Sequence, residues 1–148
     1  MRKVLLICLA AALFAGNGMI AYKSRYNVDE TTKRLVAMLR EKGVTLFKVV
    51  DHSDGAHSAG MQMKPMKLVI FGNPKMGTPL MQCAPTLGLD LPQKMLIYEN
   101  NASETVVVYN SPKYLFWRHD VPETCAPGIQ KKMGAVLQRF AKYAAGIR

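Results

Sequence analysis

The sequence predicts an α+β fold, a single domain in which helices pack on a largely antiparallel sheet. Segments with strand and helix periodicity follow one another without the regular strand–helix–strand alternation of a parallel sheet. Two apolar segments separated by a short polar turn are typical of a β-hairpin, which is antiparallel. The 148 residues, 49% of them hydrophobic, suffice for one domain with its own core and argue against disorder.

The N-terminus has the three-part pattern of a secretory signal. Two basic residues precede a run of 12 apolar residues, and small residues allow cleavage after Gly18, or after Ala15 or Ala21. Such a run is shorter than the roughly 20 residues that a membrane-spanning helix needs. We expect 1–18 to be a cleaved signal peptide and 19–148 to be a soluble periplasmic or secreted domain without an integral membrane segment.

The chain is basic, with a formal net charge of +10. Its first 18 residues contain two of the 20 basic residues and none of the 10 acidic ones, so the expected mature chain carries +8. A charge of this sign suits nucleic acid or anionic lipid. No aromatic-rich basic stripe or nucleic-acid motif accompanies it, and export argues against nucleic acid. A solvated basic surface is therefore favoured, and no nucleic-acid partner is expected.

The first half of the domain begins with a predicted strand over 19–26. Asn27 then has the position of a helix cap, with Glu30 three residues later completing a capping box. Apolar residues follow at helical spacing until Gly43, where the helix is predicted to end. A second strand is predicted over 44–52.

The middle of the chain is divided by proline. A short helical piece is predicted over 57–63, followed by a third strand over 67–72. Thr78 is a natural cap and Pro79 fits the first position of a helix, so a short helix is predicted to start there and to continue over 80–84.

A second constrained connector over 88–92 leads into the last third of the chain. The hairpin pairs 94–99 with 105–110, and a short helix is predicted over 112–117. The final helix, 129–147, places apolar residues on one face and most of its basic residues elsewhere. Its apolar stripe is expected to contact the core, although a basic amphipathic helix can also bind a membrane surface.

The loop over 71–80 is the candidate binding site. It holds two glycines and two prolines, and a loop so restricted usually keeps one backbone shape for binding or packing. The expected ligand contacts come from this loop and from the ends of neighbouring elements: His52, Phe71, Asn73, Lys75, Thr78, Tyr109 and His119. Asn73 and Thr78 would supply hydrogen bonds, Lys75 charge, and the aromatic residues an apolar wall.

The same loop superficially matches the phosphate-binding pattern G-x-x-x-x-G-K-[ST]. Thr78 occupies the position of the essential lysine, and Pro74 removes a backbone N–H that would cradle phosphate. Nucleotide hydrolysis is therefore excluded. A small anion held near Lys75 at the expected helix start remains an alternative, as does a purely structural turn.

A methionine-rich segment offers a second candidate site. His57, Met61 and Met63, with Met66 nearby, present imidazole and thioether ligands that suit Cu(I). Core packing is the favoured alternative, because the chain has ten methionines and methionine fills irregular gaps. The sequence therefore predicts a protein without a cofactor, and copper binding is the alternative.

No catalytic constellation can be assembled from the sequence, so no catalytic residue is assigned. Paired carboxylates and nucleophile motifs are absent. A hydrolase or isomerase with His52 or His119 as general base is a further hypothesis, which requires both imidazoles to approach one cleft.

In the expected mature chain Cys83 and Cys125 could form a disulfide in an oxidising compartment, or remain as two buried thiols.

From about Tyr26 to Val121 the chain resembles the DUF302 family. The resemblance rests on D-H at 51–52, F-G-N-P-K-M-G-T-P-L-M at 71–81, D-L-P-Q-K at 90–94, Y-N-S-P at 109–112 and R-H at 118–119. It implies a small α+β domain of unknown function, found alone with a signal peptide or joined to other domains, and is consistent with a homodimer. Asp120 stands where glycine is commoner, and the three methionines from Met61 to Met66 lie outside the motif.

Taken together, these patterns predict an exported, non-enzymatic domain that binds a small ligand or a partner protein at the 71–80 loop.

Overall fold

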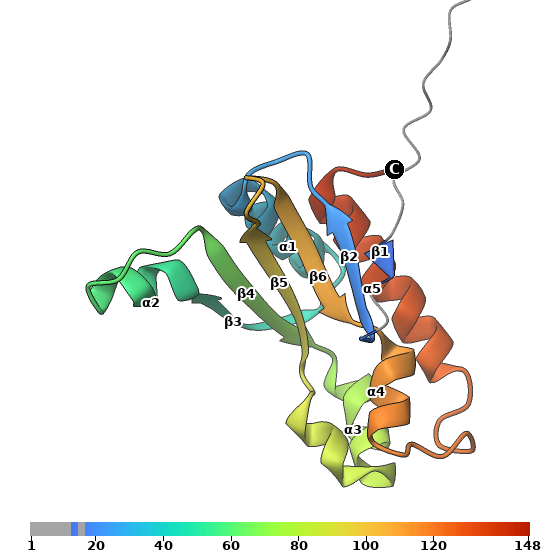
Figure 1. Ribbon diagram of the computed structural model, residues 1–148. Helices are drawn as coiled ribbons and strands as arrows, with labels where there is room; N and C mark the ends of the chain where they lie inside the picture. Colours follow the sequence, from blue (N-terminus) through green and yellow to red (C-terminus); the bar gives the residue numbers. More distant parts are fainter. Residues whose placement is uncertain (1–12, 15–16) are drawn as a thin grey trace, which may run out of the picture.

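A computed structural model describes residues 13–14 and 17–148 of the chain. The expected α+β fold is confirmed. Within these residues six strands form one sheet in the order β1-β2-β6-β5-β4-β3, and every neighbouring pair is antiparallel (Figure 1). The strands are β1 (Leu13–Phe14), β2 (Met19–Lys23), β3 (Thr45–Asp51), β4 (Met66–Gly72), β5 (Gln93–Glu99) and β6 (Thr105–Asn110).

The helices divide into a layer on the sheet and a group beyond its end. Helices α1 and α5 contact each other and the strands, while α3 and α4 lie below the sheet in Figure 1 and α2 projects to one side. The helices are α1 (Val28–Glu41), α2 (His52–Ser58), α3 (Pro74–Cys83), α4 (Pro112–Arg118) and α5 (Ile129–Ala145), with a 3-10 helix η1 (Pro85–Leu89).

Part of the predicted signal peptide, 1–12 and 15–16, lies outside the described residues, and its cleavage stays a prediction. Leu13–Phe14, within the same segment, pairs with Ile20 and Ala21 of β2.

The core lies between one face of the sheet and the layer of α1 and α5. Alternate strand residues point into it, because successive side chains of a strand face opposite sides. The core includes Val69, Met95 and Val107 of the sheet and Leu35 and Leu39 of α1. All five residues are fully buried. Each such side chain contributes about 1.5–3 kcal/mol by leaving water.

Helix α1 begins as the sequence predicts. The side chain of Asn27 accepts a hydrogen bond of 2.8 Å from the backbone N–H of Glu30, which would otherwise lack a partner in the first turn. The predicted hairpin is also confirmed as β5 and β6.

Helix α2 starts five residues earlier than predicted. The expected helical piece at 57–63 is replaced by 52–58, and His52 is the first helical residue rather than the last of a strand. The cause is Asp51, whose carboxylate accepts a 2.9 Å hydrogen bond from the backbone N–H of Asp54 and so caps the helix directly after β3.

The start predicted for the next helix is also wrong. Asn73, not Thr78, caps α3, accepting a 3.0 Å hydrogen bond from the backbone N–H of Lys75, and Pro74 occupies the first turn. Two cap-proline signals, Asn73-Pro74 and Thr78-Pro79, therefore compete within seven residues, and the helix begins at the first. Thr78 and Pro79 consequently lie inside α3.

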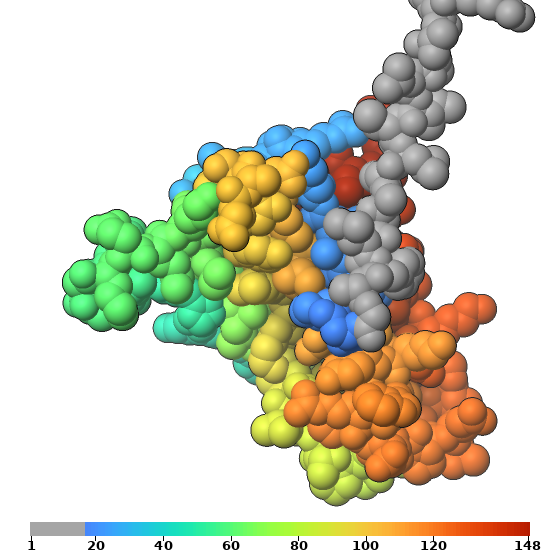
Figure 2. Space-filling model, viewed as in Figure 1, coloured from blue at the N-terminus to red at the C-terminus, as the bar shows by residue number. Residues whose placement is uncertain are grey.

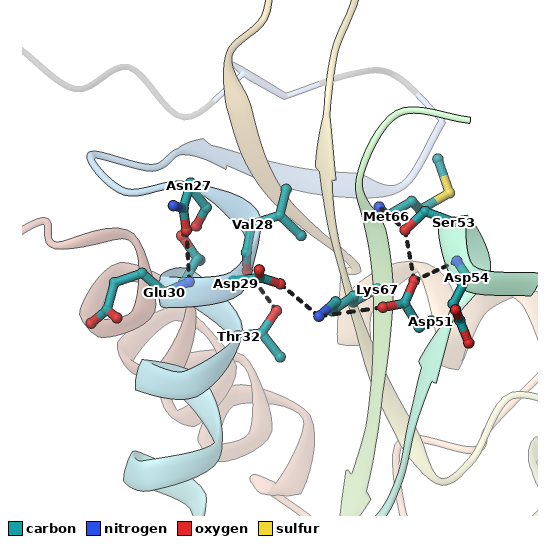
Figure 3. A network of polar contacts seen from close by, with 11 residues as sticks. Asn27, Val28, Asp29, Glu30, Thr32, Asp51, Ser53, Asp54, Met66 and Lys67 are labelled. Carbon is teal, nitrogen blue, oxygen red and sulfur yellow. Dashed lines mark hydrogen bonds and ion pairs between the residues drawn. The ribbon is translucent and has the colours of Figure 1, made fainter. Parts of the chain in front are cut away.

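A polar network ties α1, the end of β3 and β4 together (Figure 3). Asp51 accepts a hydrogen bond of 2.6 Å from the hydroxyl of Ser53 as well as the one from Asp54, and its carboxylate lies 3.3 Å from Lys67 Nζ. Lys67 also lies 2.6 Å from Asp29 of α1. The Ser53 hydroxyl, followed by the Asp54 N–H and Lys67, lowers the pKa of Asp51 from 3.8 to about 2.

This network predicts an acid-sensitive contribution to stability. Because the folded protein lowers the pKa of Asp51, the carboxylate stabilises the fold above about pH 4, and that stabilisation is lost as the pH falls towards 2. Asp51→Asn keeps an oxygen acceptor but removes the charge. We expect it to lower the free energy of unfolding at pH 6 and to match the wild type near pH 2, measured by urea denaturation.

Glu123→Gln, which removes an exposed carboxylate, is the control and should leave this pH dependence unchanged. A deficit of Asp51→Asn that persists undiminished at pH 2 would show that the charge of Asp51 is not its cause.

Candidate functional site

A pocket of about 240 Å³ lies at the end of the sheet, between α3 and α5. Strands β3 and β4, helix α3, the connector after η1 and helix α5 each supply part of its wall. The lining residues are Val44, Phe47, Phe71, Gly72, Asn73, Pro74, Met76, Gly77, Thr78, Met81, Leu91, Pro92, Gln93, Met133, Val136, Leu137 and Phe140.

The wall of this pocket is mostly apolar. Phe71 of β4 and Phe140 of α5 meet edge to face with ring centroids 6.1 Å apart. Three methionines, Met76, Met81 and Met133, add flexible thioether side chains that can adapt to a guest.

Polar groups reach the pocket at three positions. Asn73 and Thr78 contribute an amide and a hydroxyl from α3, although the Asn73 oxygen is already engaged in capping. Gln93, the first residue of β5, is 9% exposed, and its Nε2 donates to Met133 Sδ at 3.0 Å. A thioether is a weak acceptor, so the buried Gln93 amide has only a weak partner in the pocket.

Phe47 reaches the pocket because β3 contains an irregularity. Leu46 pairs with Phe71, but Lys48 pairs with Ile70, so Phe47 is an extra residue in the ladder. Its side chain remains 51% exposed. Phe47 therefore forms a partly solvated edge of the pocket.

Gly77 forms part of the wall on α3. A Cβ placed there would lie 3.8 Å from Leu91 Cδ1 and 3.9 Å from Met81 Cε, which are ordinary contacts. A methyl group would therefore fit at this position, whereas a longer side chain would extend further into the space that the lining residues enclose.

The predicted binding residues divide into two groups. Phe71, Asn73 and Thr78 line the pocket, whereas Lys75, exposed on α3, does not. His52, Tyr109 and His119 also lie outside its lining, so the expected gathering of these three with the loop does not occur.

The strand register explains the position of His52. Gly72, beside the pocket, pairs with Thr45, while Asp51 pairs with Lys67 at the other end of the antiparallel pair. His52 follows Asp51, so roughly 17 Å of strand separates it from the loop. Helix α2 accordingly projects away from α3 and α4 in Figure 1. His52 is the first residue of α2 and His119 directly follows α4, so the two histidines lie on elements that are apart.

Tyr109 is a core residue rather than a pocket residue. It is 4% exposed on β6, and its hydroxyl finds no hydrogen-bond partner within the described residues. Burial, with a smaller effect from the neighbouring Tyr22, raises the pKa of Tyr109 well above its usual range. It therefore stays neutral at physiological pH.

His119 fixes the connector next to the pocket. Its Nε2 lies 2.6 Å from the Asp90 carboxylate and its Nδ1 lies 3.0 Å from the Thr86 hydroxyl, and its side chain is 5% exposed. Arg118 also approaches Asp90, at 3.4 Å. Because Asp90 directly precedes Leu91 in the pocket wall, His119 holds that wall in place from outside.

A disulfide joins the same two parts of the chain. Cys83, at the end of α3, is bonded to Cys125 in the segment before α5, with 6.2 Å between their Cα atoms. The disulfide and the His119–Asp90 contact thus both connect the α3–η1 region to the chain that follows α4.

The methionine-rich segment is not part of the core. Met61 is 60% exposed and Met63 is 42% exposed, so core packing does not account for them. His57 is exposed on α2, and Met66 is partly buried at the start of β4. Copper binding by these residues stays a prediction. Within the described residues no three His, Cys, Asp or Glu side chains form a group that could hold a metal ion.

The sequence patterns missed several pocket residues. Met133, Leu137 and Phe140 belong to the stripe predicted as a core contact, and one side of this stripe borders the pocket. Gln93 lies in the D-L-P-Q-K motif, and its position directly after Pro92 was the available signal.

In the described part of the chain, no helix is both long and apolar enough to cross a membrane.

Three Brucella proteins are similar to this chain over 130 residues, each at 38% identity and covering 88% of it. They are the fluoride-specific ion channel FluC 1 of Brucella suis biovar 1 (strain 1330), FluC 1 of Brucella abortus biovar 1 (strain 9-941) and FluC 2 of Brucella melitensis biotype 1 (strain ATCC 23456). The matched part is 51% of the first protein and 48% of the other two, so the chain spans about half of their length.

A solved structure has the same fold. It is the crystal structure of an uncharacterized conserved DUF302 protein from Bacillus stearothermophilus, which matches with a TM-score of 0.67 at 17% identity. The match covers 87% of this chain and 96% of the other. The family model described as "Domain of unknown function DUF302" matches residues 20–140. Because the family model matches most of the chain and the motif-bearing loop lies within the match, the protein belongs to the DUF302 family.

Proposed function

We propose that this protein binds a small, mostly apolar molecule in the pocket between α3 and α5, and that it does so without catalysis. The observation that carries the proposal is the make-up of the pocket lining. Among the described residues that line it, none has a side chain that ionises near neutral pH. General acid–base or nucleophilic chemistry requires such a group beside the substrate, whereas binding of an apolar molecule does not.

The volume limits the size of the ligand. An engineered apolar cavity of about 150 Å³ accommodates benzene, and pockets for drug-sized ligands start at about 300 Å³. The pocket of about 240 Å³ therefore suits a single substituted ring or a medium-length acyl chain. The exposed edge at Phe47 leaves a way for one end of the ligand to reach solvent.

Gln93 indicates one polar feature of the ligand. Its Nε2 donates only to the sulfur of Met133, and a buried amide gains more from an oxygen acceptor than from a thioether. A ligand carbonyl or carboxylate oxygen would replace that weak partner. We therefore expect an apolar ligand with one hydrogen-bond acceptor, and we place the binding protein outside the cytoplasm on the strength of its N-terminal pattern.

Gly77 allows a direct test of the pocket. We expect hexanoate, octanoate and benzoate, added separately, to shift the NMR signals of the Gln93 side-chain amide and of residues 76–81. Gly77→Leu should weaken this binding at least tenfold by filling the pocket. Gly77→Ala should retain it, because its added methyl makes only ordinary contacts.

Both variants should unfold at or above the wild-type temperature, because each replaces a helical glycine with a better helix former. If no probe shifts these signals, or if Gly77→Leu binds as well as the wild type, the pocket is not the binding site.

We infer a second candidate function, as a partner of a fluoride-specific ion channel. The supporting observation is that about half of each Brucella channel protein is similar to this chain at 38% identity. A domain that is similar to half of a channel protein can contribute to the function of such a channel.

A chimera tests this candidate. In the Brucella suis FluC 1 protein, the half similar to this chain would be deleted or replaced by residues 17–148. Fluoride release from proteoliposomes should fall on deletion and recover to at least half of the original rate in the chimera. A chimera no more active than the deletion, or a deletion with full activity, would rule out the partnership.

A further inference from the structure

The outer face of α5 is basic and has no role in the pocket. Residues 124–148 contain no aspartate or glutamate. Lys131, Lys132 and Arg139 are exposed and Lys142 is half-buried, whereas Met133 and the rest of the apolar stripe are buried against the core. Helix α5 therefore cannot insert its apolar side into a membrane, and only its cationic side is available to a partner.

These cations are free to meet an external anion. Within the described residues, none of the four forms an ion pair with a carboxylate, in contrast to Lys64 and Lys67, which do. The basic face is thus not compensated from within the domain.

An exposed tryptophan adjoins the basic face. Trp117 of α4 is 74% exposed, with its ring 6.0 Å from that of Tyr114. One surface groove is lined by Lys113, Trp117 and Gln130, and a neighbouring one by Lys113 and Lys131. The orange atoms of α4 and the orange-red atoms of α5 lie against each other at the lower right of Figure 2, as one continuous surface.

We propose that this α4–α5 surface, made of Lys113, Trp117, Lys131, Lys132 and Arg139, docks on an anionic phospholipid bilayer. Indole rings prefer the boundary between lipid and water, and cations near that boundary are attracted to anionic headgroups. A merely solvated basic surface would leave the indole without a role. The inference is independent of the pocket ligand, and it would place the domain beside a membrane, as the second candidate function also requires.

Two acidic residues reduce the attraction without reversing it. Asp120 and Glu123 line the same groove as Lys113 and Trp117. The proposed surface has four cations, Lys113, Lys131, Lys132 and Arg139, against these two carboxylates, so its net charge remains positive.

Trp117 itself reports the docking, because it is the only tryptophan of the chain. Its fluorescence would be recorded with the full chain and two kinds of vesicle, pure phosphatidylcholine and phosphatidylcholine with 30 mol% (about one lipid in three) phosphatidylglycerol, a composition chosen to give an anionic surface. We expect a blue shift and quenching by brominated lipid with the anionic vesicles only, and reversal in concentrated salt. The neutral vesicles report any binding by the apolar N-terminal run.

Matched pairs of substitutions separate this surface from overall charge. The double substitution Lys131→Gln with Lys132→Gln should lower the partition coefficient for anionic vesicles on the order of 30-fold. Each lysine near the membrane surface contributes about fivefold to that coefficient. The control double substitution, Lys48→Gln with Lys75→Gln, removes two positive charges outside the α4–α5 surface. It should change the partition coefficient less than about threefold, because salt screens charges that lie far from the membrane.

Gly77→Leu should bind vesicles as the wild type does, which keeps this result distinct from the pocket experiment. The proposal is overturned if anionic vesicles do not shift the emission of Trp117, if neutral vesicles shift it equally, or if both pairs of glutamine substitutions weaken binding to the same extent.

Discussion

The structure depends on the burial of one face of an antiparallel sheet beneath α1 and α5. Side chains such as Leu39, Met95 and Leu137 leave water almost completely there, which is the main favourable contribution to folding. The pocket lies where this layer reaches the end of the sheet. Beyond the last strand residues, the inner side of α5 is faced by α3 and by Leu91 and Pro92 instead of by strands.

The wall opposite α5 is held from outside. Helix α3 and the connector after η1 have few strand contacts, and two links attach them to the chain beyond α4: the Cys83–Cys125 disulfide and the pairing of His119 with Asp90. These two links keep the pocket in shape when no ligand is bound, because loops and short helices with few contacts otherwise open easily. His119 and Asp90 of the family motif thus support the pocket wall without lining it, whereas His52 lies at the other end of β3.

The sequence was sufficient where signals are local. The Asn27 cap, the hairpin and the amphipathic stripe of α5 each depend on spacing within a few residues, and the fold class follows from their order. The predicted start of a helix was wrong where two capping residues compete, as at Asn73 and Thr78, because tertiary packing decides between them. The site could only partly be predicted, since which end of β3 lies beside the loop depends on strand register. His52 was therefore placed at the wrong end, and Gln93 was not assigned.

The extra residue at Phe47 has a consequence beyond the pocket. In the described part of the chain, β3 is the outermost strand on its side of the sheet, and a strand in that position offers unpaired N–H and C=O groups to any passing chain. Insertion of Phe47 interrupts the regular spacing of those groups, and Lys48 follows it with a charge. A second sheet could align with only one side of the interruption. The distortion that brings an aromatic ring to the pocket is therefore also expected to disfavour open-ended strand addition at this edge.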